Sequence, residues 1–238
     1  MVRTDIETAI EAFKSKSGPN ERYASFDYCY NYFSSTENIT KDIEKSCLML
    51  GFYLASWGMF RGSSFLLQRS VKGFDTTVRY ISGLEKSVWN IDVDSYTDEN
   101  MQMITDIYEN IKGCLIDNGN ADLVLITKIL LGVFGFVPAF DRYFGNTFRD
   151  VSGGRCGFRR VNKNSLTVIK KFYEANRETI DRLSSHTFTT DFLTGLKRLK
   201  ITQKQKLLIC MASLWALRHQ DIKVTTERSL VVGYFYEN

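Results

Sequence analysis

The sequence predicts an all-α globular protein. Only two of the 238 residues are proline, and apolar residues recur at helical spacing over long stretches. Proline removes a helical hydrogen bond and clashes with the preceding turn, so its scarcity permits long helices. Hydrophobic residues make up 44% of the chain and aromatic residues 13%. This composition supplies a core and argues against disorder.

Nine helices are predicted from the apolar spacing, at residues 4–16, 21–34, 39–60, 73–84, 98–115, 121–134, 139–150, 163–184 and 203–219. Several have start signals: Thr97 precedes an acidic first turn, and Asn162 or Asn164 can cap the helix that follows. Stop signals are also present, since Gly119 separates two helices and Gly135 ends another.

The sequence is consistent with two domain organisations. The chain forms either a single helical domain over 1–238, or two packed helical subdomains with a cleft between them. In the second organisation, residues 1–115 and 203–238 form one subdomain and residues 116–202 form the other. The helical pattern is broken at residues 151–161, where glycines and arginines interrupt the helices.

Charge is distributed unevenly along the chain. Residues 142–206 contain 15 Lys and Arg against 5 Asp and Glu, a net charge of +10. Residues 1–141 contain 13 basic against 19 acidic residues, a net charge of −6. A basic segment behind an acidic one is typical of a surface for a polyanion. The alternative is an ordinary solvated face with scattered lysines.

The remaining composition narrows the class of protein. The five cysteines are widely spaced and include no C-x-x-C, which predicts reduced thiols and a cytoplasmic location. His186 and His219 have no metal spacing, so neither a metal nor a cofactor is expected. The apolar run 47–60 is shorter than the roughly 18 residues of a membrane span, and we interpret it as a buried core helix.

The segment FGFVPAFDRYF, residues 134–144, is the first candidate site. Gly135 ends the preceding helix, and Pro138 disfavours helix at the residue before it. Asp141 then falls in the first turns of the next helix, near the positive end of the helix dipole. This position favours the ionised carboxylate that a base or an electrostatic stabiliser needs. The alternative role for Asp141 is a simple helix cap.

Residues 116–148 resemble the helix-hairpin-helix DNA glycosylase superfamily. VPAFDRYF matches the loop and aspartate of that family, and IDNGNAD matches the hairpin that grips backbone phosphates. The resemblance implies a glycosylase-like fold in which Asp141 stabilises the cationic sugar as a flipped base leaves. It assigns phosphate binding to the hairpin residues Asn118, Gly119 and Asn120.

The sequence departs from the family pattern in two ways. The family hairpin usually has two glycines separated by one residue, and this sequence has only Gly119. Family members that also cut the strand use a lysine just after the hairpin. Residues 122–124 contain no lysine, and Lys128 lies a full turn later. The resemblance therefore implies a monofunctional glycosylase that uses water.

A second stretch, FYLASWGMFRGSSFLLQ, supplies aromatic and polar side chains suited to a flipped base. Aromatic rings stack on bases, and Arg, Ser and Gln can bind the polar edges of a base. We expect a base pocket that faces Asp141 and is formed by Tyr53, Trp57, Arg61, Ser64 and Gln68. The first three share one face of the predicted helix 39–60. The alternative is a core helix with its tryptophan packed inside.

A third stretch, RDVSGGRCGFRRVNKNS, combines glycines with basic residues. Glycines let the backbone approach phosphates, and basic side chains supply the charge. The predicted DNA-binding residues are Arg155, Arg159, Arg160 and Lys163 in this stretch, together with Arg142 before it. The alternative is a flexible linker with solvated arginines.

These observations lead to one hypothesis and two alternatives. The hypothesis is a monofunctional DNA glycosylase that flips out and excises a damaged base or a modified base, for example one in phage DNA. The first alternative is a non-catalytic helical nucleic-acid-binding or regulatory module in which Asp141 is only a cap. The second is a helical protein-interaction scaffold whose basic patch meets an acidic partner.

Overall fold

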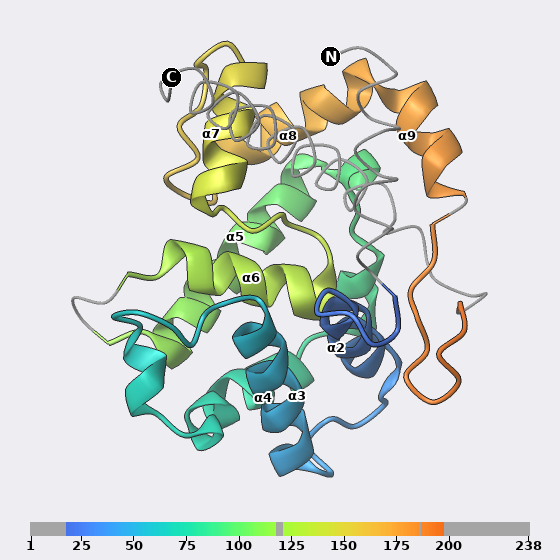
Figure 1. Cartoon of the computed structure of the whole chain (residues 1–238). Coiled ribbons are helices and arrows are strands. Elements are labelled where there is room, and N and C mark those ends of the chain that lie inside the picture. The colour runs from blue at the N-terminus through green and yellow to red at the C-terminus, as the bar shows by residue number, and fades with distance from the viewer. Residues whose placement is uncertain (1–17, 118–120, 186, 198–238) are drawn as a thin grey trace, which may run out of the picture.

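A computed structural model of the chain describes residues 18–117, 121–185 and 187–197, and in these ranges it confirms the all-α fold (Figure 1). Eight α-helices occur in the described residues: α2 (Ala24–Ser35), α3 (Ile43–Ser56), α4 (Asp75–Ser82), α5 (Asp98–Leu115), α6 (Leu123–Phe134), α7 (Arg142–Val151), α8 (Lys163–Ala175) and α9 (Arg177–Ser184). Short 3-10 helices connect them: η1 (Phe65–Gln68), η2 (Val71–Phe74), η3 (Lys86–Asn90) and η4 (Val93–Ser95). The predicted helices 4–16 and 203–219 lie outside the described residues.

Helix α6 occupies the centre of the described fold. Figure 1 shows it crossing the middle of the molecule, with α2, α3 and α4 on one side and α7, α8 and α9 on the other. It packs directly against α2, α3 and α5, and α5 in turn contacts α4 and α8. Buried side chains from α2 through α9 form a continuous hydrophobic core. None of the described helices has the length and hydropathy needed to cross a bilayer.

The sequence of α6, LVLITKILLGVF, explains its position. Every residue from Leu125 to Phe134 is buried, so the helix is covered on all sides. Aromatic side chains from other elements direct their polar tips to its carbonyl groups. Tyr53 donates its hydroxyl to Lys128 O at 2.9 Å, and Trp89 donates its indole N–H to Val133 O at 2.8 Å. These side chains bury apolar rings while satisfying their own donors.

The end of α3 corrects the predicted helix 39–60. The helix stops at Ser56, because Gly58 adopts a left-handed conformation with φ 76°. Its N–H donates to Ala55 O at 2.9 Å, and the next N–H, of Met59, donates to Leu54 O at 2.9 Å. This pair of bonds is a Schellman motif, which terminates a helix at a glycine.

The Schellman motif also corrects one assumption about the predicted base pocket. Arg61 follows the Gly58 turn and belongs to no helix. It therefore does not share a helix face with Tyr53 and Trp57. Those two side chains still contact each other, with ring centroids 5.7 Å apart.

The other predicted helices differ mainly at their ends. The helix at 98–115 is confirmed as α5, and Thr97 caps it by accepting a 3.2 Å hydrogen bond from Asn100 N. The predicted helix 163–184 is two helices, α8 and α9. They are divided at Asn176, whose side-chain amide donates to Phe172 O at 2.8 Å. A side chain that bonds the preceding turn competes with helix continuation there.

Residues 187–197 are tied to α2 by buried polar groups. Thr190 N donates to the Asp27 carboxylate at 2.8 Å, and Asn31 Nδ2 donates to Thr190 O at 3.0 Å. Thr189 donates its hydroxyl to Asn31 Oδ1 at 2.7 Å. Burial raises the pKa of Asp27 to about 6, and the hydrogen bonds from Thr190 act in the opposite direction.

Replacing Gly132 by Ala is expected to destabilise the protein by about 1–3 kcal/mol, because the added methyl group overpacks the core. A Cβ at this position would lie 2.2 Å from the Tyr53 ring. Urea denaturation measures the free energy of unfolding. Gly113→Ala in α5 is the matched control, since its Cβ would meet nothing within 4 Å. Equal stability of the two variants would contradict the close approach of α3 and α6.

Asp27 is expected to make stability depend on pH. Its pKa is raised from 3.8 to about 6 in the folded state, so the folded state binds the proton more tightly than the unfolded state. The stabilisation is fully present below pH 3.8 and is lost as pH rises through about 6. Relative to Asp27→Asn, the wild type should lose about 2 kcal/mol between pH 4 and pH 7. If the unfolding free energies of the wild type and Asp27→Asn change equally between pH 4 and pH 7, the prediction is contradicted.

Candidate functional site

The segment between α6 and α7 holds Asp141 in place. Gly135 ends α6 with φ 70°, and its N–H donates to the carbonyl groups of Leu130 and Leu131 at 3.1 and 2.9 Å. Residues 135–140 are all buried. Phe140 N donates a buried 2.9 Å hydrogen bond to the Thr127 hydroxyl, which attaches the end of the segment to α6.

Asp141 itself is the N-terminal cap of α7. One oxygen, Oδ1, accepts a hydrogen bond from Phe144 N at 2.9 Å, and Asp141 O accepts one from Gly145 N at 2.9 Å. The side chain is half-buried. No hydrogen bond among the described residues involves Oδ2. The carboxylate thus lies at the positive end of the α7 dipole, and one of its oxygens has no partner among the described residues.

Lys128 is the residue of this region to which the sequence analysis gave no role. It lies in the middle of α6, only 6% exposed, and its Nζ donates to Trp57 O at 2.6 Å. Burial lowers the pKa of its ammonium, the nearby Asp141 carboxylate raises it, and Arg61 and Arg22 lower it. A single lysine in an otherwise apolar helix is the signal that would have identified it, because buried ammonium groups need partners.

Arg22 and Arg61 complete the charged surroundings of Lys128. Arg22 precedes α2, is exposed, and donates through Nε to Ser56 O. Arg61 is also exposed, and its guanidinium lies against the Gly58 backbone. A Cβ at Gly58 would lie 3.2 Å from that guanidinium, which an exposed arginine side chain can relieve by moving, so the positive φ is what favours glycine here.

Trp57 lies in the same region, at the end of α3. Its ring is half-buried among aromatic side chains, with centroids 5.5 Å from Tyr23 and 6.4 Å from Phe26. Its indole N–H is buried and has no hydrogen-bond partner among the described residues. Lys128 therefore connects two predicted parts of the site: it bonds the Trp57 carbonyl and interacts electrostatically with Asp141.

The other predicted pocket residues have structural roles or lie apart. Tyr53 is fully buried, and its hydroxyl is bonded to α6. Ser64 caps η1 by accepting a 3.3 Å hydrogen bond from Leu66 N. Gln68 is exposed at the end of η1. No contact among the described residues links Ser64 or Gln68 to Asp141.

The predicted DNA-binding residues occupy several elements. The hairpin residues Asn118, Gly119 and Asn120 lie outside the described residues. The described members of the set are all exposed: Arg142, Arg155, Arg159, Arg160 and Lys163.

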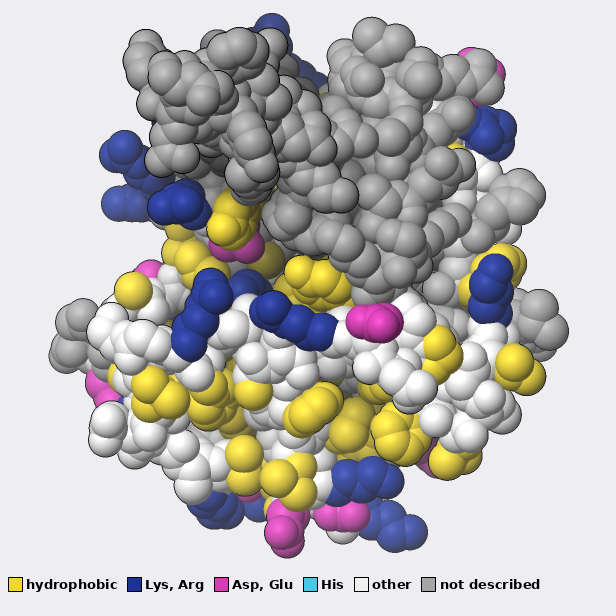
Figure 2. Space-filling model, in the orientation of Figure 1, with side chains coloured by type: hydrophobic (Ala, Val, Ile, Leu, Met, Phe, Trp, Pro, Cys, Tyr) yellow, Lys and Arg dark blue, Asp and Glu magenta, His cyan; other side chains and the backbone are white. Residues whose placement is uncertain are grey.

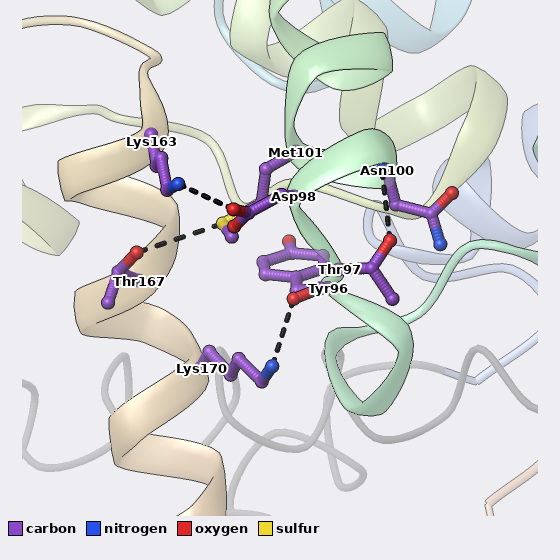
Figure 3. Close-up of polar contacts among 8 residues, drawn as sticks. All are labelled: Tyr96, Thr97, Asp98, Asn100, Met101, Lys163, Thr167 and Lys170. Atoms are coloured by element: carbon purple, nitrogen blue, oxygen red, sulfur yellow. Dashed lines mark hydrogen bonds and ion pairs between the residues drawn. The ribbon is translucent and has the colours of Figure 1, made fainter.

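Lys163 has a structural partner. Its Nζ lies 2.7 Å from the Asp98 carboxylate in the first turn of α5 (Figure 3). Further along α8, Lys170 Nζ donates to Tyr96 O at 3.0 Å, and the Thr167 hydroxyl lies 3.8 Å from the Met101 sulfur. These contacts join α8 to the start of α5. Lys163 is therefore partly neutralised on the surface where DNA binding was predicted.

A separate shallow hollow of about 370 Å³ lies between α3, η2 and α4. Cys47 and Asp75 line it, and Asp75 is ion-paired with Lys72 and Arg79. It contains none of the predicted site residues. The described residues include no group of three or more His, Cys, Asp or Glu side chains placed to hold a metal ion.

Comparison of the chain with protein-family models, curated proteins and solved structures finds no match.

Replacing Thr127 by Val is expected to destabilise the protein by about 1–3 kcal/mol, since it leaves the buried Phe140 N–H without an acceptor. Chemical denaturation measures the change. Thr127→Ser keeps the hydroxyl and loses the methyl group, so it measures the packing contribution of this side chain separately. A Val variant as stable as the wild type would show that this bond does not hold the segment before α7.

Proposed function

We propose that this protein binds DNA and acts as a monofunctional DNA glycosylase, releasing a damaged or enzymatically modified base. The observation that carries the proposal is the placement of Asp141. Its carboxylate is fixed at the start of α7, has one oxygen without a partner among the described residues, and interacts with Lys128, which also bonds the Trp57 carbonyl. An aromatic ring and a fixed carboxylate in one region suit a flipped nucleotide.

The proposed reaction breaks the bond between C1′ of the sugar and the base nitrogen. The leaving base takes the electron pair of that bond, and positive charge develops on the sugar. Asp141 stabilises this charge because its carboxylate is held in position before the reaction begins. Water then adds to C1′, and the proton that it gives up passes to the departed base, which leaves a neutral free base and an abasic sugar.

The presence of Lys128 near Asp141 does not make the proposed enzyme one that also cuts the DNA strand. A lysine nucleophile must be free to attack C1′. The Lys128 amine is instead buried and donates to a backbone carbonyl. Water remains the nucleophile in the proposed reaction.

A second candidate function is a non-catalytic nucleic-acid-binding module. The observation that favours it is the 2.9 Å hydrogen bond from Phe144 N to Asp141, which by itself accounts for an aspartate at this position. This candidate keeps DNA binding and predicts no product.

The test is release of free base, measured by mass spectrometry, from DNAs that carry normal, damaged and phage-type modified bases. Asp141→Asn should lose release by at least about a hundredfold, because it removes the charge that stabilises the sugar. Asparagine caps helices as well as aspartate does, so the variant should fold.

Asp42→Asn is the matched control. Asp42 caps α3 in the same manner, accepting a 3.1 Å hydrogen bond from Lys45 N. Its replacement should leave base release unchanged. Release by Asp141→Asn at the wild-type rate would refute the catalytic role. DNA binding with no release from any substrate would favour the non-catalytic module.

A further inference from the structure

Three cationic side chains from separate parts of the chain meet at the end of α3. Arg22 precedes α2, Arg61 follows the Gly58 turn, and Lys128 belongs to α6. Arg22 Nε and Lys128 Nζ bond consecutive carbonyl groups, those of Ser56 and Trp57. The last turn of α3 has no basic residue of its own, so these side chains supply the positive charge that the carbonyl end of a helix favours.

Most of the hydrogen-bonding capacity of the two arginines is unused. A guanidinium has five N–H donors. Arg22 uses one on Ser56 O, and the guanidinium of Arg61 donates no hydrogen bond to the described residues. Neither arginine is ion-paired with a carboxylate in the described part of the chain. Both are exposed, whereas Lys128 is buried behind them.

The charges in this region do not balance. Lys128 interacts electrostatically with each of the two arginines, and Asp141 is the carboxylate that interacts with it. The three cations therefore exceed this carboxylate by two charges. Figure 2 shows Lys and Arg side chains near the middle of this face, with an acidic side chain beside them and hydrophobic side chains above and below.

We propose that Arg22 and Arg61 form an anion-binding site that holds a backbone phosphate of DNA beside Asp141, with Lys128 as the buried positive charge behind it. Planar guanidinium groups suit this ligand because they bind phosphate oxygens through paired N–H donors. The site also offsets the repulsion between the Asp141 carboxylate and a polyanion. The identity of the anion as a DNA phosphate rests on the proposed function.

This site differs from the basic surface expected from the sequence. Its two arginines come from the part of the chain whose net charge is negative, and they interact with Lys128, as Asp141 does. The phosphate that they hold is therefore one next to the extruded nucleotide. Contacts of this kind position the strand and carry no base specificity.

The test is binding of the full chain to a fluorescent DNA duplex over a range of salt concentrations. Arg22→Gln and Arg61→Gln should each lower affinity about five- to tenfold at low salt, and each should reduce the salt slope by about one. Arg22→Lys and Arg61→Lys should largely restore the slope, since they keep the charge. Arg79→Gln in α4 is the charge-matched control, because Arg79 is ion-paired with Asp75 and lies outside this site.

The outcomes separate this site from the proposed catalysis. Loss of affinity in both Gln variants, with wild-type affinity in Arg79→Gln, supports the site even if no DNA releases a base. Wild-type affinity and slope in Arg22→Gln and Arg61→Gln overturn the site even if the protein is a glycosylase. Failure of the wild type to bind DNA at low salt also overturns it. Circular dichroism confirms that each variant is folded.

Discussion

Burial of α6 on every side is the constraint on which the described fold depends. Its backbone groups bond within the helix or accept from side chains such as Trp89, and its apolar side chains fill the core. The polar side chains of two adjacent residues, Thr127 and Lys128, are buried as well and need partners from other segments. Thr127 accepts from the amide of Phe140, and Lys128 donates to the carbonyl of Trp57. These partners lie in different segments. Satisfying two neighbouring polar groups thus brings the start of α7 and the end of α3 to the same part of α6.

Much of the fold could be predicted because local signals agreed with the final packing. The helix at 98–115 has a capping residue, an acidic first turn and a clear apolar face, and its ends were predicted correctly. The prediction was wrong at the end of α3, where apolar residues continue past Ser56. Periodicity cannot show that Gly58 takes a left-handed conformation there. It also missed the break at Asn176, where a side chain and not a glycine or proline interrupts the helix.

The candidate site was predictable only in part. Asp141 could be placed at a helix start, since Gly135 and Pro138 mark the preceding break in the sequence itself. The burial of Lys128 was detectable from its apolar helix, but its partner was not, because Trp57 lies 71 residues away and their contact depends on how α3 packs against α6. Alignment with a hairpin pattern considered Lys128 only as a nucleophile. Its burial shows a different role, as a charge that joins the two halves of the site.

The net charge along the sequence and the positions of the charged side chains in the structure indicate different candidate surfaces for a polyanion. The basic segment supplies Lys163, but its amine is engaged by Asp98 of α5. Residues 1–141, whose net charge is negative, supply Arg22 and Arg61. The guanidinium groups of these two residues have no carboxylate partner among the described residues. An arginine already paired with a carboxylate must give up that interaction before it can bind a phosphate, whereas an unpaired one loses only water. Net charge counted along the sequence therefore does not decide which cations are available to a polyanion, since Arg22 and Arg61 lie in a part of the chain whose net charge is negative.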